Sequence, residues 1–163
     1  MSTSQDDPDL RTRLFVGPNA SYYLEAWEVA RLKKSHSWNW ASFIFGEIWL
    51  SYRKMYFHVI TIQMVVIAVA VFVQFVLAKS VGEALVDVVG YVFIRLFIAI
   101  YLGAYGNAIY GEFVRQNITF NIDLVGAEYA NRVIRNSGGV SNAAAFLTLI
   151  VLVLELVLSA KHL

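Results

Sequence analysis

The sequence contains no cysteine, and this absence excludes disulfide bonds, thiolate catalysis and metal sites built on cysteine. Histidine is also scarce. His36, His58 and His162 are far apart, and none has a carboxylate or a second histidine at the spacing that metal ligation needs. We therefore expect no metal site and no cofactor.

Charged residues are few as well, 15% of the chain against 58% apolar residues, and the mean hydropathy is +0.58. This balance is ordinary in a membrane protein. The formal net charge of +1 conceals an uneven layout, because seven basic residues precede the first long apolar run: Arg11, Arg13, Arg31, Lys33, Lys34, Arg53 and Lys54. Basic residues beside membrane anchors set orientation, so we expect contact with a lipid bilayer and no binding of nucleic acid.

Catalytic motifs are missing too. No glycine-rich phosphate loop follows a strand, since the sequence predicts no convincing strand, and the serines have no evident base or nucleophile elbow. The run Gly103-Ala104-Tyr105-Gly106 is typical of helix packing rather than of nucleotide binding. We expect no enzymatic activity.

What the sequence does contain is three apolar runs that are long enough to cross about 30 Å of hydrocarbon. They are residues 56–78, which carry no formal charge, residues 86–110 and residues 143–160, with Ser141 as a plausible N-cap of the last. The predicted fold class is an all-α membrane protein with three transmembrane helices. To these we add a cytoplasmic amphipathic N-terminal helix and an interfacial or re-entrant aromatic segment.

The remaining segments are polar. Residues 1–13 have nothing to bury, so disorder is expected. Residues 14–36 predict a turn around Gly17-Pro18 and then a helix, either lying on the membrane surface or packing its apolar face on the aromatic segment that follows. Residues 111–142 predict a cytoplasmic loop that contains a short helix ending near Gly138.

The aromatic segment spans residues 37–55. Its apolar part is about 20 Å long as a helix, too short to cross a bilayer, and Gly46 is the expected bend. Its tryptophans suit the boundary between headgroups and hydrocarbon, and the basic pair that follows suits phosphate headgroups. The predicted interfacial or partner-contact residues are Trp38, Trp40, Trp49, Arg53 and Lys54. The alternative is a core packed by aromatic side chains.

This segment also carries a family resemblance. It reads Ser-Trp-Asn-Trp-Ala-x-Phe-x-Phe-Gly-x-x-Trp-x-x-Tyr-Arg-Lys-Met-Tyr over residues 37–56, with Phe-Val-Gly-Pro-Asn-Ala-x-Tyr-Tyr over residues 15–23. Together with Tyr105-Gly106-Asn107-x-x-Tyr110 and Gly138-Gly139-Val140-Ser141, it resembles domain-of-unknown-function family 2628. The resemblance implies a small polytopic bacterial inner-membrane protein and brings no agreed activity. A proline often follows the glycine of the aromatic segment in that family, whereas this chain has Glu47.

Counting basic residues on each side of the predicted spans gives the orientation. Seven lie in the N-terminal arm and three in the 111–142 loop, namely Arg115, Arg132 and Arg135, whereas the other side has only Lys79 and Lys161. The N-terminus and the 111–142 loop should therefore be cytoplasmic and the C-terminus outside.

Two charged residues lie deep inside the predicted spans. Arg95 and Glu155 fall at the same depth, roughly 5 Å outside the midplane at about 1.5 Å per residue, so they should pair, helped by Gln74. One reading is a hydrogen-bonded pair that sets helix order and register, and the other is a proton or ion path. Asn107, at the cytoplasmic end of its span, could bond an exposed carbonyl or the aromatic segment.

The predicted function is that of a non-enzymatic accessory or interaction protein of the membrane, with a membrane-protein partner or a second copy of the chain as possible partners. The alternative is a small channel or transporter subunit with Arg95 and Glu155 on the path.

Overall fold

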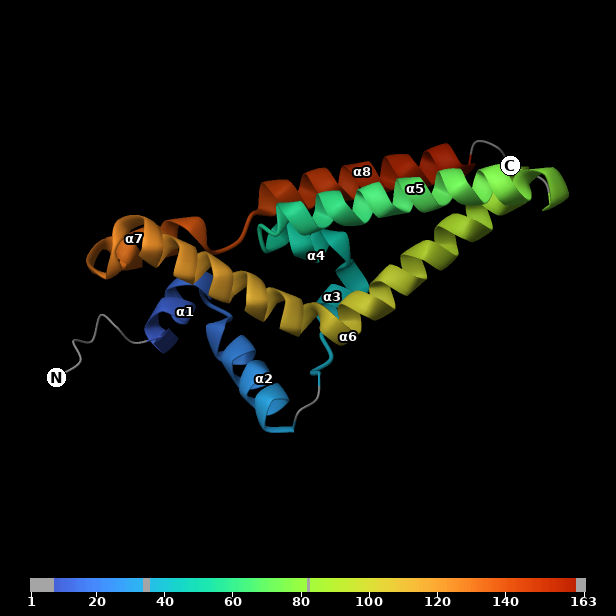
Figure 1. Cartoon of the computed structure of the whole chain (residues 1–163). Coiled ribbons are helices and arrows are strands. Elements are labelled where there is room, and N and C mark those ends of the chain that lie inside the picture. The colour runs from blue at the N-terminus through green and yellow to red at the C-terminus, as the bar shows by residue number, and fades with distance from the viewer. Residues whose placement is uncertain (1–7, 34–35, 82, 161–163) are drawn as a thin grey trace. The chain divides into compact units, whose positions relative to one another are not determined.

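The computed structural model describes residues 8–33, 36–81 and 83–160, and over these residues it contains helices and connecting turns but no strand (Figure 1). The predicted all-α class is confirmed. The helices are α1 (Pro8–Val16), α2 (Ala20–Lys33), α3 (Trp40–Phe45), α4 (Glu47–Tyr52), α5 (Tyr56–Val81), α6 (Glu83–Val125), α7 (Ala127–Ser137) and α8 (Asn142–Ala160).

Helices α5 and α8 and the stretch of α6 from Val89 to Tyr110 are mostly apolar around their circumference. Two described helices are long and apolar enough to cross a membrane, through Tyr56–Val73 in α5 and within Val89–Val125 in α6, and α8 makes a third if it is counted together with α7. Large side chains along them are exposed, among them Phe57, Met64, Phe75, Phe97, Phe146 and Leu154. A helix that is apolar all round and exposed suits lipid better than water, so the chain has the helices of a membrane protein.

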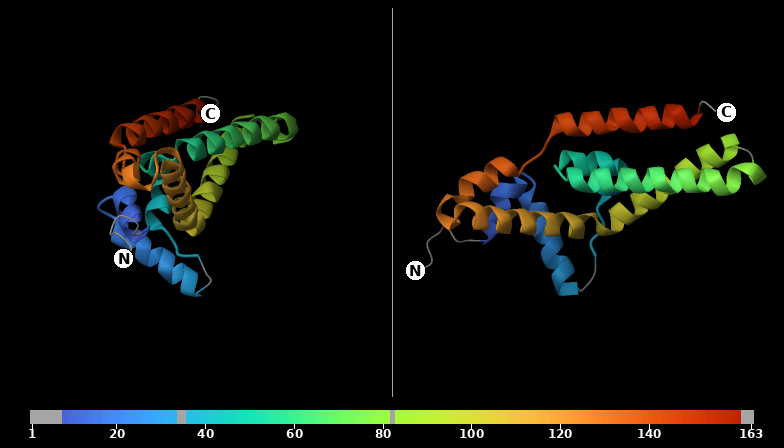
Figure 2. Two further views of the ribbon diagram at one scale, coloured as in Figure 1. Left: turned by 60° about the vertical axis from the view of Figure 1, so that its left-hand side comes forward. Right: turned by 45° about the horizontal axis from the view of Figure 1, so that its top comes forward.

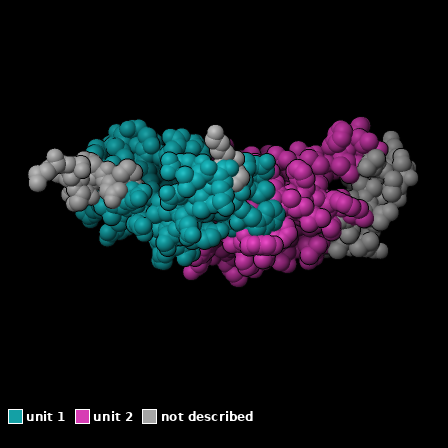
Figure 3. Space-filling model, turned by 90° about the horizontal axis from the view of Figure 1, so that it is seen from below, with its two compact units in different colours: residues 1–39, 104–140 teal, residues 40–103, 141–163 magenta. Residues whose placement is uncertain are grey.

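The chain forms two compact units, coloured separately in Figure 3. Unit 1 comprises residues 1–39 and 104–140, and unit 2 comprises residues 40–103 and 141–163. Helix α6 contributes to both, to unit 2 up to Gly103 and to unit 1 from Ala104.

Unit 2 is organised around the short helix α4, which contacts α3, α5 and α8. Hydroxyl oxygens of Ser51 and Thr148 share a 2.5 Å hydrogen bond between α4 and α8, and the Ser141 amide donates to the Tyr52 carbonyl at 2.8 Å. Ser141 Oγ accepts a hydrogen bond from the Ala144 amide, which confirms the predicted N-cap of α8. The second half of the aromatic segment is therefore packed against helices.

The break between α3 and α4 is at Gly46. Its backbone angles are φ 49° and ψ −119°, a combination that is open to glycine and strained for other residues. The bend predicted at this glycine is confirmed. It separates Trp40–Phe45 from Glu47–Tyr52 and so gives the second half of the segment its own direction.

Unit 1 has an aromatic core. Tyr23 of α2 packs edge-on against Tyr110 of α6 at 4.8 Å between ring centroids, and Phe15 of α1 packs on Phe113 at 6.0 Å. The contacts of α1 with α2 and α7 can be followed in Figure 2. Beside α7 the backbones touch, because the Gly139 amide donates to the Phe15 carbonyl at 2.6 Å. The apolar face of α2 thus packs on α6.

Two predictions about polar segments are wrong. Residues 8–13 were expected to be disordered, yet they belong to α1, which packs on α7; the rest of that prediction, residues 1–7, lies outside the described residues. The span expected to end at residue 110 continues as helix to Val125, where a loop was predicted. Asn117 and Asn121 bond backbone carbonyls one turn back, so polar side chains that usually favour loops are accommodated in the helix. The short helix predicted in the 111–142 loop is α7, and it ends at Ser137, close to the predicted glycines.

Candidate functional site

A cluster of polar side chains from four helices lies inside unit 2, with the Arg95 guanidinium at its centre. Nη1 of Arg95 on α6 donates to Oε2 of Glu47 on α4 at 2.6 Å. Nη2 donates to Oε2 of Glu155 on α8 and, at 3.2 Å, to Oε1 of Gln63 on α5. We call these four residues the Arg95 cluster. Each of the helices α4, α5, α6 and α8 contributes one polar group to it.

The Arg95 cluster is well shielded. Glu47 is only 3% exposed, and the side chains of Arg95 and Glu155 are 18% and 26% exposed. Bonds between a guanidinium and carboxylates are charge-assisted and strong in such surroundings, so the cluster ties the four helices together.

Tyr91 lies one helical turn before Arg95 and covers the guanidinium. Its ring centroid is 5.1 Å from Cζ of Arg95, within the range of a cation–π contact, and its hydroxyl donates to the Leu152 carbonyl at 3.5 Å. Tyr91 therefore links α6 to α8 beside the Arg95 cluster. It was not among the residues singled out from the sequence, although its i, i+4 spacing to a buried arginine was visible there.

The structure brings Arg95 and Glu155 together, the two residues that equal depth suggested as a pair. The side chain of Gln74, their expected helper, lies outside the described residues, and the amide that contacts Arg95 belongs to Gln63. Glu47 was missed as a partner. It could have been recognised as an acidic residue inside an apolar segment, at the position where the family that the sequence resembles often has proline.

The predicted interfacial residues separate into two groups. Trp40 is 66% exposed and Trp38 is 39% exposed, as a membrane or partner contact requires, and Lys54 is half-buried. Trp49 and Arg53 are buried, at 5% and 4% exposed. The reason is the bend at Gly46, which turns α4 onto α5 and α8, and Arg53 packs over the Tyr52 ring.

A second polar cluster lies inside unit 1, around Asn107. Its Oδ1 accepts a 2.8 Å hydrogen bond from Asn39, its Nδ2 donates to the Ser37 hydroxyl at 2.9 Å, and its carbonyl accepts from Trp27 at 2.7 Å. Asn39 and Asn107 are 1% and 2% exposed. The expectation that Asn107 bonds the aromatic segment is confirmed. These bonds hold the start of that segment and α2 on α6, which is a structural role.

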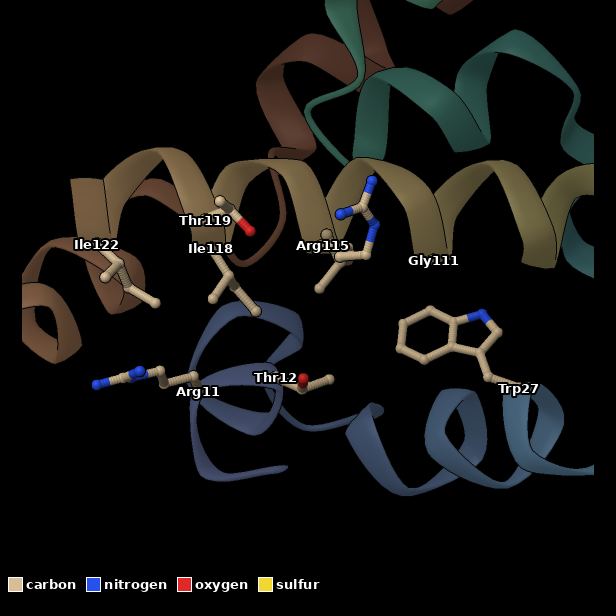
Figure 4. A pocket seen from close by; sticks show the side chains of 9 residues that line it. Arg11, Thr12, Trp27, Gly111, Arg115, Ile118, Thr119 and Ile122 are labelled. Atoms are coloured by element: carbon tan, nitrogen blue, oxygen red, sulfur yellow. The ribbon is translucent and has the colours of Figure 1, made fainter. Parts of the chain in front are cut away.

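Unit 1 also has an open pocket of about 370 Å³ between α1, α2 and α6 (Figure 4). Figure 4 shows Arg11, Thr12 and Trp27 on one side and residues of α6, including Arg115 and Thr119, on the other. Both arginines are engaged: Arg11 donates to Asn131, and Arg115 donates to Glu112 through two nitrogens. The pocket therefore lacks an uncommitted charge to select a ligand.

Neither cluster has the composition of a metal site. Over residues 8–33, 36–81 and 83–160, no group of three or more His, Cys, Asp or Glu side chains is placed to hold a metal ion. Of these sites, the Arg95 cluster has the chemistry best suited to a function beyond packing, because it places two carboxyl groups and a guanidinium in an apolar unit.

Comparison with known proteins gives one family and no individual relative. No curated protein and no solved structure matches the chain. The family described as "Protein of unknown function (DUF2628)" matches residues 10–116, a stretch that covers most of α1, all of α2 to α5 and most of α6, and includes Glu47, Gln63 and Arg95. The chain therefore belongs to the DUF2628 family.

Proposed function

We propose that this chain is a small polytopic protein of the bacterial inner membrane, with unit 2 in the bilayer and unit 1 in the cytoplasm. In this proposal it acts as a non-enzymatic accessory or interaction protein, and residues 14–36 and the N-terminus are cytoplasmic. It is assigned no catalytic role, cofactor, metal or nucleic acid, for the reasons drawn from the sequence.

Helix lengths support placing unit 2 in the bilayer. The part of α6 that belongs to unit 2, residues 83–103, would be about 31 Å long, and α8 would be about 28 Å long at ~1.5 Å per residue, close to the ~30 Å hydrocarbon thickness. The segments predicted as cytoplasmic, 14–36 and most of 111–142, belong to unit 1. The division of the chain thus agrees with the predicted topology.

Charge supports the orientation. Unit 1 holds eight of the 13 Lys and Arg residues, and the positive-inside tendency would keep this unit in the cytoplasm. Reporter fusions test it. A fusion at residue 125 should be active as a cytoplasmic reporter, and a fusion at the C-terminus should be active as a periplasmic one. Reporters on the same side would rule out three spans in this orientation.

The interaction role rests on one observation, the exposed face of α3. Trp40 and Ile44 are each 66% exposed and lie at i and i+4, on one side of the helix, and the next residue, Phe45, is 54% exposed. An apolar groove of about 280 Å³ beside them is lined by α3, α4 and Ala145 of α8. Aromatic and branched side chains around a groove are the usual anchors of a protein contact.

Photo-crosslinking in living cells tests this role. A photoreactive amino acid at position 40 should capture one defined membrane protein or a second copy of this chain. The matched control is position 50, a leucine of the same segment that is fully buried, does not line the groove and should capture nothing. Ile44→Lys should abolish the adduct formed from position 40. Adducts with lipid alone, or equal capture from positions 40 and 50, would contradict the proposal.

A second candidate, a small channel or transporter subunit, is favoured by the two carboxyl groups that face Arg95. Purified protein in liposomes should then carry ions or protons, and Glu155→Gln should stop the flux. Glu112→Gln is the matched control, since Glu112 is exposed and paired only within α6. Absence of flux from well-folded reconstituted protein would leave the accessory role.

A further inference from the structure

The charges of the Arg95 cluster do not balance if both carboxyl groups are ionised. One guanidinium faces Glu47 and Glu155, and among the described residues no other cation makes an ion pair with either carboxylate. Two carboxylates and one guanidinium leave a net charge of −1 in an apolar unit. The other titratable group at the cluster is Tyr91, whose ring covers Arg95, and α3 contributes none.

A second observation concerns a single atom, Oε1 of Glu47. It accepts no hydrogen bond from any described residue, although the side chain is 3% exposed and its other oxygen is bonded to Arg95. A buried ionised carboxylate with one oxygen unpaired is costly, and protonation lowers that cost because it removes the charge. The geometry thus points to a neutral carboxyl group at this place.

We propose that the Arg95 cluster is a proton-binding site that holds one exchangeable proton at neutral pH, shared by the carboxyl groups of Glu47 and Glu155. With the proton bound, the cluster is neutral, and after its release the cluster carries the full charge of −1. Because both carboxyl groups contact the same guanidinium, the proton belongs to the pair and not to one of its members.

A metal cation would fit the Arg95 cluster less well than a proton. Hard cations such as Ca²⁺ take six or more oxygen ligands, whereas the Oε2 atoms of both glutamates and Oε1 of Gln63 already accept hydrogen bonds from Arg95. A proton needs one oxygen and leaves these bonds in place.

The inference rests on the proposed position of unit 2 in the bilayer, which keeps water from the carboxyl groups. To both candidate functions it adds a site at the junction of four helices. The net charge of this site changes when the proton is released. In an accessory protein the proton neutralises the junction, and in a transporter it would be the species carried.

Infrared spectroscopy of the full chain in ether-linked lipid, which has no ester carbonyl band, measures the proton directly. Labelling of glutamate with ¹³C identifies the band of a protonated glutamic acid. At neutral pH we expect one such group in the wild type and none in either Glu47→Gln or Glu155→Gln, because a single carboxylate then balances Arg95. Arg95→Gln should have two, and the control Glu112→Gln should keep one.

Absence of the band from the wild type at neutral pH overturns the proposal, whatever the variants do. Persistence of the band in either glutamate variant also overturns it, since burial and not charge balance would then hold the proton. Unchanged helical content and elution volume show that a variant is folded, and the wild-type measurement needs no variant. The reporter fusions and the flux assay are separate readouts, so a wrong topology or absent transport is distinguishable from an absent proton.

Discussion

Glu47 and Arg95 lie 48 residues apart in the sequence, yet Nη1 of Arg95 donates a 2.6 Å hydrogen bond to Oε2 of Glu47. This contact joins the aromatic segment to the second long apolar helix, and Arg95 extends it to Gln63 and Glu155. The family match covers both residues of the contact, whereas Glu155 lies beyond it. The stability and the charge state of unit 2 should therefore depend on three charged side chains and not on one pair.

The first prediction concerns how the stability of unit 2 changes when one, two or all three charges of the Arg95 cluster are removed. Arg95→Leu leaves the buried Glu47 and the part-buried Glu155 carboxyl groups without their cation and should destabilise unit 2 by about 3–5 kcal/mol, as for other broken buried ion pairs. Arg95→Leu with Glu155→Leu should be less harmful, and the triple variant with Glu47→Leu less harmful still. Denaturant unfolding of purified protein in mild detergent measures the free energy of unfolding of each variant. Equal loss in the single and double variants would contradict the pairing.

A second prediction tests the bend that brings Glu47 to Arg95. A Cβ at Gly46 would meet no atom within 4 Å, so Gly46→Ala carries only the strain of the backbone angles, of order 1–3 kcal/mol. Gly90→Ala is the control, because Gly90 lies inside α6 and its new methyl group would be 3.9 Å from Val73, an ordinary contact. Thermal unfolding should show a clear loss for Gly46→Ala and little change for Gly90→Ala. Similar losses for both would mean that the bend is not strained.

The regular geometry of a helix was enough to predict the contact of Arg95 with Glu155. Charged residues at the same depth in neighbouring apolar helices have few other groups to pair with. The same argument could not find Glu47. Its position depends on the direction that α4 takes after Gly46, and that direction is set by packing on α5 and α8. Sequence spacing reports the depth of a residue in a continuous helix, but not the path of a short helix after a break.

Polar composition was misleading in unit 1 for a related reason. Residues 8–13 and 111–125 have the composition of loops, and both are helical because each has a partner to pack on. Helices α1 and α6 make aromatic contacts such as Phe15 on Phe113, and α1 makes hydrogen bonds such as Arg11 to Asn131. Tertiary packing overrides local propensity where a short helix is only part of a larger core.

A third prediction addresses the buried asparagine pair of unit 1. Asn107→Leu leaves the Asn39 amide buried without its acceptor and should cost about 1–3 kcal/mol. Asn39→Ala alone should also destabilise, and the double variant should cost less than the sum, since the two residues act on one contact. Gln116→Ala, an exposed amide of the same helix, is the control and should change little. Additive losses in the double variant would count against the contact.

The last prediction concerns the place where α1 meets the end of α7. A Cβ at Gly138 would lie 2.2 Å from the Phe15 carbonyl oxygen, and that atom belongs to the backbone, so it cannot move without displacing α1. Gly138→Ala should therefore release the N-terminal arm, which trypsin would then cut faster at Arg11 and Arg13. Gly111→Ala is the milder comparison, because its Cβ would lie 3.0 Å from the Trp27 indole, a side chain that can shift.

The two glycine variants separate a backbone clash from crowding of a side chain. We expect tryptic cleavage of the arm to accelerate strongly in Gly138→Ala and only slightly in Gly111→Ala, with full-length protein quantified over time. The contacts that hold α1 include the hydrogen bond from the Gly139 amide to the Phe15 carbonyl and the bond from Arg11 to Asn131, and both depend on the approach that the clash prevents. If Gly138→Ala leaves the cleavage rate unchanged, α1 does not depend on this contact, and residues 8–13 would have another reason to be helical.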